Sequence, residues 1–184
     1  MTVVERAGER GLVVAAREID RGEFQQVYRQ AWPDVFRYAL LLSRHRQDAE
    51  DIAADTFRRA FESWADGRGP SGDVMPWLFV IARCIVIDRH RRSRLLGWLP
   101  LEQAAEPSDA GEEAAFRSSE VWIWFEQLCR VLPAKQREAL ILRFQFDFSD
   151  SEASKVMGTS VGNVRTLVSR GLATLRVRAE GMER

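Results

Sequence analysis

The chain has 184 residues, and 46% of them are apolar, which is enough for one domain or two small ones with folded cores. Its 27 basic and 27 acidic side chains balance, so binding partners have to be inferred from local concentrations of charge. No apolar run approaches the roughly 18 residues of a membrane-spanning helix, and there is no signal-peptide core. We therefore expect a soluble cytoplasmic protein.

The two cysteines, Cys84 and Cys129, form no CxxC pair and have no histidine cluster nearby. This pattern argues against a metal site and favours a reducing compartment. Their positions on the expected helices predict that both are buried and have no redox role. We expect neither a bound metal nor a cofactor.

Residues 1–23 mix charged and small apolar residues without a clear stripe, and we interpret them as an N-terminal arm with room for a short helix at residues 12–19. From Phe24 to Leu40 apolar residues recur at helical spacing, which predicts a helix that Pro33 kinks or breaks.

The next helix is predicted to begin at Asp48 as its N-cap and to run to Trp64 behind an almost unbroken apolar stripe. Its other face begins acidic, with Asp51 and Asp55. Carboxylates in a first turn stabilise a helix through its dipole, and this explains Asp48 and Asp51 better than Asp55. A metal-dependent nuclease also needs clustered carboxylates, but the rest of such a site is missing from the sequence.

A glycine-rich loop at residues 66–73 lacks the GK[ST] ending of a phosphate-binding loop, so we interpret it as a connector. The helix that follows from Pro76 ends in five arginines within twelve residues: Arg83, Arg89, Arg91, Arg92 and Arg94. Such a run suits a nucleic-acid backbone, whereas capping the end of a helix would need only two of them.

Residues 96–119 are rich in acidic residues, proline and glycine, which predicts a disordered or extended tether. Helical spacing resumes at Glu120, and Pro133 opens a helix to about Phe146.

Residues 149–176 predict two helices joined by a tight turn. Ser149 and Glu152 form a capping box, Gly158 supplies a left-handed residue that ends the first helix, and Ser160 caps the second. This is the pattern of a helix-turn-helix, whose second helix enters the major groove of DNA. An ordinary helical hairpin with a basic face remains the alternative.

Three ordered blocks resemble the sigma-70 family of bacterial transcription initiation factors, and the short length resembles its extracytoplasmic-function group. The blocks are DAEDIAADTFRRAFESW at 48–64, PWLFVIARCIVIDRHRR at 76–92, and LPAKQREALILRF with the helix-turn-helix at 132–176. The resemblance implies an all-α fold of two small helical modules, sigma region 2 and sigma region 4, joined by a flexible acidic linker. The corresponding domains are the arm at 1–23, region 2 at 24–95, the linker at 96–119 and region 4 at 120–184.

The resemblance implies a non-enzymatic factor that binds core RNA polymerase and directs it to promoters through their minus-10 and minus-35 elements. Core polymerase would bind Asp48, Asp51 and Asp55. The opened minus-10 strand would contact Arg83, Arg89, Arg91 and Arg92. The minus-35 element would contact Arg165, Thr166, Ser169 and Arg170. Trp64 and Trp77 are expected mainly in the core, because both lie on apolar stripes.

The implied partners are core RNA polymerase, promoter DNA and an anti-sigma factor, without membrane insertion. Leu167 and Ser169 stand where the family commonly has Arg and an aromatic residue or His, so the resemblance predicts the role of this helix better than its preferred sequence. The alternative function is a helix-turn-helix regulator whose N-terminal helices sense or dimerise. An enzyme acting on nucleic acid is disfavoured by the missing catalytic constellation.

Overall fold

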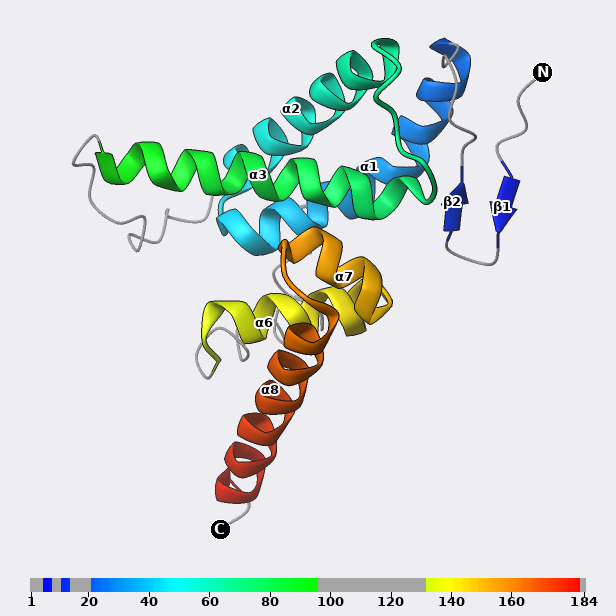
Figure 1. The fold of residues 1–184 in the computed structure, drawn as a ribbon. Coiled ribbons are helices and arrows are strands. Elements are labelled where there is room, and N and C mark those ends of the chain that lie inside the picture. Colours follow the sequence, from blue (N-terminus) through cyan, green and yellow to red (C-terminus); the bar gives the residue numbers. More distant parts are fainter. Residues whose placement is uncertain (1–4, 8–10, 14–20, 96–131, 183–184) are drawn as a thin grey trace. The chain divides into compact units, whose positions relative to one another are not determined.

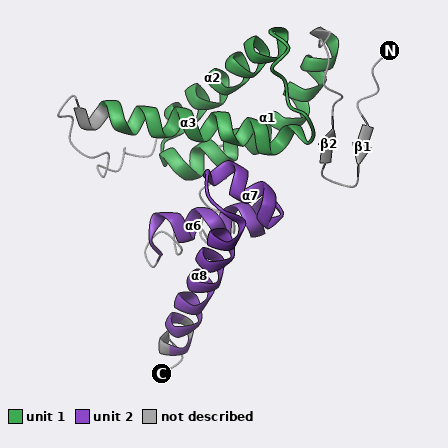
Figure 2. Ribbon diagram, in the orientation of Figure 1, with its two compact units in different colours: residues 1–104 green, residues 105–184 purple. Residues whose placement is uncertain are grey.

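A computed structural model describes residues 5–7, 11–13, 21–95 and 132–182, which belong to two compact units, residues 1–104 and 105–184 (Figure 2). The first unit contains β1 (Glu5–Ala7), β2 (Gly11–Val13), α1 (Arg21–Ser43), α2 (Arg46–Ala65) and α3 (Val74–Leu95) (Figure 1). The second contains α6 (Ala134–Leu140), the π-helix η1 (Ile141–Gln145), α7 (Asp150–Met157) and α8 (Val161–Met182).

The predicted all-α fold of two helical modules is confirmed, with β1 and β2 forming one short antiparallel pair in the described part of the arm. The helix considered at residues 12–19 is wrong where it can be checked, because β2 occupies its first residues. The predicted tether and the helix expected from Glu120 lie almost entirely outside the described residues.

In the first unit α1, α2 and α3 pack against one another around a core drawn from all three. Aromatic rings join α1 to α2: the ring centroid of Phe24 lies 5.1 Å from that of Phe61 and 6.0 Å from that of Trp64, and both pairs meet edge to face. The ring of Tyr38 stacks on that of Phe79 of α3 with centroids 4.4 Å apart. Such pairs stabilise beyond the area that they bury, so they fix how the three helices lie together.

Pro33 was predicted to kink or break its helix. It lies inside α1 and does not break it, and the axis of α1 changes direction along its length in Figure 1, so only the break is excluded. The predicted start of α2 differs in the structure. Asp48 is not an N-cap, because α2 already begins at Arg46 after His45. The turn before it is formed by Arg44, whose φ of 64° is left-handed, and by the Ser43 hydroxyl, which donates to the His45 carbonyl at 3.1 Å. Asp48 therefore belongs to the first turn of α2.

The connector between α2 and α3 has a packing role that its composition did not reveal. A Cβ atom added at Gly69 would lie 2.4 Å from Cδ1 of Trp64, so the loop backbone passes directly against the indole ring. Trp64 is 1% exposed, and its ring meets that of Trp77 edge to face with centroids 5.6 Å apart. Trp64 is therefore a core residue as predicted, and Trp77 is partly buried.

The second unit contains the predicted helix-turn-helix. The Ser149 hydroxyl accepts from the Glu152 backbone amide at 3.2 Å, while the Glu152 carboxylate accepts from the Ser149 amide at 2.6 Å, so the capping box is confirmed. Gly158 has the left-handed φ of 61° that was expected. The Ser160 hydroxyl caps α8 by accepting from the Asn163 amide at 3.2 Å. On α8, Val164 is fully buried, and Val168, Leu172 and Leu175 pack on Leu132 and Leu140.

The helix predicted to start after Pro133 is present but changes form along its length. It is α-helical from Ala134 to Leu140 and becomes the π-helix η1 from Ile141 to Gln145. Asp147, with a φ of 59°, then turns the chain toward α7. Phe148, which follows this turn, is only 6% exposed and belongs to the core.

Candidate functional site

The three carboxylates of Asp48, Asp51 and Asp55, which we call the acidic face, lie on α2 away from its buried stripe. Their side chains are 40%, 55% and 31% exposed, while Ile52, Ala53 and Thr56 behind them are buried. The Thr56 hydroxyl is satisfied by donating to the Ile52 carbonyl at 2.7 Å, so this polar residue does not interrupt the stripe. The structure thus brings together the residues predicted to bind polymerase.

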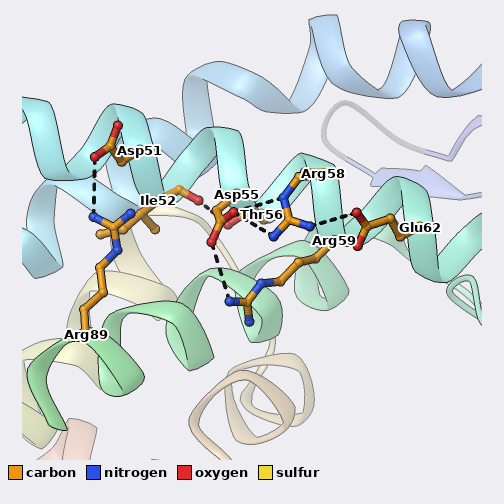
Figure 3. Close-up of polar contacts among 8 residues, drawn as sticks. All are labelled: Asp51, Ile52, Asp55, Thr56, Arg58, Arg59, Glu62 and Arg89. Carbon is orange, nitrogen blue, oxygen red and sulfur yellow. Dashed lines mark hydrogen bonds and ion pairs between the residues drawn. The ribbon is translucent and has the colours of Figure 1, made fainter. Parts of the chain in front are cut away.

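Asp55 is the most constrained residue of the acidic face (Figure 3). Its Oδ1 accepts from Arg58 Nε at 3.1 Å and from Arg58 Nη2 at 2.9 Å, and its Oδ2 accepts from Arg59 at 3.5 Å. The hydrogen bond from Arg58 holds the pKa of Asp55 below its ordinary value, with help from the charges of Arg58, Arg59 and Arg89 and against the effect of partial burial. The hydrogen bonds that Arg58 donates to Asp55 and Glu62 raise the pKa of Arg58 in turn. Asp55 is therefore a fixed, permanently charged carboxylate at neutral pH.

Arg89 of α3 reaches the same surface from the neighbouring helix. Its Nη1 lies 3.6 Å from Asp48 Oδ1 and 3.7 Å from Asp51 Oδ2. A shallow hollow lies here, lined by Asp51, Ala54, Asp55, Arg58 and Arg89. Arg89 was predicted as a contact to the minus-10 strand, but in the structure its guanidinium faces carboxylates of its own chain (Figure 3).

The other arginines of the run on α3 are spread around the helix. Arg91 and Arg92 are exposed and Arg83 is partly buried. Because an α-helix advances about 100° per residue, Arg83 and Arg92 lie on roughly opposite sides, so the four arginines do not form one row. Cys84 is exposed, and the prediction that it is buried is wrong. Ala82, Ile85 and Val86 lie on the buried stripe, and Cys84 turns outward because it is about 200° around the helix from both Ala82 and Val86.

The predicted minus-35 contacts share one face of α8, which we call the reading face. Arg165, Thr166, Ser169 and Arg170 are all exposed, and their spacing places them on adjacent turns away from the buried Val164. The Thr166 hydroxyl donates to the Gly162 carbonyl at 2.9 Å. Exposed arginines on the second helix of a helix-turn-helix can reach base edges and phosphates.

Sequence reasoning missed Asp150, which contacts this face from outside α8, and Arg143, which pairs with Asp150. Asp150 Oδ2 accepts from Arg165 Nε at 2.9 Å, and Asp150 Oδ1 lies 2.9 Å from Arg143 Nε. Asp150 and Arg165 are fifteen positions apart, and no periodicity links them. An acidic residue in the first turn of α7 looks like a dipole partner from sequence alone.

Within the described ranges, no group of three or more His, Cys, Asp and Glu side chains is arranged to hold a metal ion. None of the helices described is long and apolar enough to cross a membrane.

Comparison with known proteins decides the family. A sequence model of sigma-70 region 2 matches residues 27–95, and one of sigma-70 region 4 matches residues 123–175. The two matches fall in the two separate units and together cover about two thirds of the chain. The chain belongs to the sigma-70 family. It is a transcription initiation factor rather than an enzyme or a free-standing helix-turn-helix regulator.

Similar proteins are named extracytoplasmic-function sigma factors, and this chain is of the same type. The extracytoplasmic-function sigma factor BldN of Streptomyces coelicolor is 29% identical over 167 residues, which are 89% of this chain and 63% of BldN. The sigma factor SigD of Mycobacterium tuberculosis is 29% identical over 177 residues, covering 92% of this chain and 84% of SigD. Among solved structures, the sigma factor RpoE in complex with the anti-sigma factor NepR, from Bartonella quintana, gives a TM-score of 0.67. It has 27% identity, and the match covers 85% of this chain and 96% of that one.

Proposed function

We propose that this sigma factor binds core RNA polymerase through the acidic face of α2 and selects promoters through α3 and the reading face of α8. In this proposal Asp48, Asp51 and Asp55 contact a basic surface of polymerase. The opened minus-10 strand contacts Arg83, Arg91 and Arg92, with Arg89 reaching it after leaving its carboxylate partners. The minus-35 element contacts Arg165, Thr166, Ser169 and Arg170.

The observation that supports this assignment best is that the acidic face and the reading face lie on different units. The acidic face is exposed on the unit that matches region 2, and the reading face is exposed on the unit that matches region 4. Asp55 fits a docking role because Arg58 and Arg59 fix its carboxylate without covering it. A fixed charge loses less conformational freedom on binding than a mobile one.

The proposal extends to domain boundaries, location and control. Residues 24–95 form region 2, residues 120–184 form region 4, and an acidic linker at 96–119 joins them. The protein acts in the cytoplasm, where its polymerase and DNA partners are. An anti-sigma factor is a further partner, since the similar RpoE was solved with one.

Reconstitution tests the proposed function. The full chain is mixed with core polymerase from its host and a library of promoter fragments, and the transcripts are sequenced. We expect transcripts that start at fixed positions downstream of a shared pair of elements. Transcripts that core polymerase alone produces equally well would overturn the proposal.

A further inference from the structure

We propose that Asp150 is a positioning residue that fixes the Arg165 guanidinium and thereby determines which base pair region 4 prefers in the minus-35 element. This inference rests on the proposed function, since it assumes that the reading face contacts DNA. It adds a residue of α7 to the specificity determinants of α8.

The carboxylate of Asp150 lies between two guanidinium groups. Its Oδ2 accepts from Arg165 Nε at 2.9 Å, and its Oδ1 pairs with Arg143 Nε at 2.9 Å. Arg143 belongs to η1 and is itself anchored, because its Nη1 donates to the Phe148 carbonyl. Asp150 is only 26% exposed, whereas Arg165 is 71% exposed. The contacts therefore lead from the Phe148 carbonyl through Arg143 and Asp150 to the exposed side chain of Arg165.

The geometry leaves the reading end of Arg165 available. A guanidinium has five N–H donors, and Asp150 uses only the one on Nε. The donors on the two Nη atoms form the fork that binds O6 and N7 of guanine in the major groove. A carboxylate behind Nε thus restricts the side chain to few rotamers without blocking its contact to the base, which lowers the entropy lost on binding.

The negative charge of Asp150, taken by itself, weakens the binding of the reading face to DNA of any sequence. A carboxylate near the duplex repels phosphates and weakens binding to every sequence. A residue that only adds charge would therefore raise affinity for all promoters when removed and leave base preference alone. A residue that positions Arg165 reduces base preference when removed, so the two roles predict different measurements.

The experiment also distinguishes the positioning role of Asp150 from a role in stability alone. Asp150 connects α7 with η1 and α8, so its loss can lower stability. A loss of stability reduces the active fraction of protein and scales all transcripts together, whereas a positioning role changes their ratios.

The test uses holoenzyme formed from the full chain and a promoter library with randomised minus-35 positions and a fixed minus-10 element. Asp150→Ala, Arg165→Ala and the double variant are compared with wild type. Glu180→Ala is the control, because it removes one carboxylate from an exposed position of α8. We expect Asp150→Ala to reduce the preference at one base pair about tenfold, and Arg165→Ala to reduce it at the same pair at least as much. The double variant should match Arg165→Ala, and Glu180→Ala should match wild type.

The inference is overturned if Asp150→Ala leaves base preference unchanged, or reduces it equally when Arg165 is already alanine. A wild-type library without any minus-35 preference would instead overturn the proposed function itself. Should Asp150→Ala fail to fold, the Nε–H signal of Arg165 in the NMR spectrum of the wild-type chain decides. We expect this proton to exchange with water more slowly than that of the exposed Arg170, and equal exchange rates would contradict the contact.

Discussion

The Nη1 atom of Arg89 lies 3.7 Å from the Asp51 carboxylate, so the basic run of α3 and the acidic face of α2 meet at one residue. Asp48 is a second partner of the same atom at 3.6 Å. Two surfaces proposed for different partners are therefore coupled: a cation that can bind DNA also offsets the charge that binds polymerase.

Replacing Arg89 should strengthen binding to core polymerase. Arg89→Gln leaves Asp48 and Asp51 without this cation, and exposed ion pairs are worth roughly 0.2–1 kcal/mol, so we expect affinity to rise about threefold at low salt. The measurement is a binding titration with core polymerase in the absence of DNA. Arg37→Gln is the matched control, since it removes the same charge from the Arg37–Asp34 pair on α1. Weaker binding by Arg89→Gln would show that Arg89 itself contacts polymerase.

The contacts of Asp55 predict a pH dependence of stability. The hydrogen bond from Arg58, with the charges of Arg58, Arg59 and Arg89, holds the pKa of Asp55 below its ordinary value of 3.8. The unfolded chain then takes up the proton at a higher pH than the folded chain. The stabilisation by Asp55 is therefore complete above 3.8 and is lost as the pH falls below that value through the lowered pKa.

Denaturant unfolding of wild type and Asp55→Asn measures this contribution. We expect wild type to be more stable by no more than about 1 kcal/mol near neutral pH, because the carboxylate is partly exposed, and the difference should shrink below about pH 4. A difference that stays constant through the acid range would contradict the assignment.

Gly69 should be intolerant of a side chain because of Trp64. A Cβ atom at Gly69 would lie 2.4 Å from Cδ1 and 2.5 Å from Nε1 of that indole, so Gly69→Ala must displace either the ring or the loop. Forced repacking of this kind costs about 1–3 kcal/mol. Gly72→Ala is the control in the same loop, since nothing lies within 4 Å of its Cβ. Equal unfolding free energies for the two variants would show that the loop can yield.

The capping box of α7 should be needed for the start of the helix-turn-helix. Ser149→Ala removes the acceptor of the Glu152 amide, and the loss of an N-cap costs about 0.5–2 kcal/mol. Amide hydrogen exchange at Glu152 should accelerate in the variant. Ser151→Ala changes an exposed serine inside the same helix and should leave that exchange rate nearly unaltered.

Short sequence patterns were enough to predict the ends of the helices in the helix-turn-helix of the second unit. A capping box, a left-handed glycine and a second N-cap each depend on residues within four positions, so Ser149, Gly158 and Ser160 could be assigned from sequence. The exposed reading face followed from helical spacing, because Val164 and Val168 define the buried side.

The errors concern features that the tertiary structure determines. The helix α2 begins at Arg46, before the predicted N-cap at Asp48, because Arg44 adopts a left-handed conformation that an arginine rarely takes. Pro33 is tolerated inside α1, whose two ends are held by packing on α2 and α3. The partners of Arg89 and Arg165 come from other helices, and the sequence has no signal for which carboxylate each arginine meets.

The central claim is that polymerase docking and minus-35 reading reside on different units, and one pair of variants tests it most directly. Asp51→Lys with Asp55→Lys reverses the acidic face, and Arg165→Ala with Arg170→Ala removes the arginines of the reading face. For both full-length variants, affinity for core polymerase and for a minus-35 duplex is measured. We expect the first to lose at least about tenfold in core affinity and retain duplex binding, and the second to do the reverse. Loss of both affinities in either variant, with the fold intact by circular dichroism, would contradict the account.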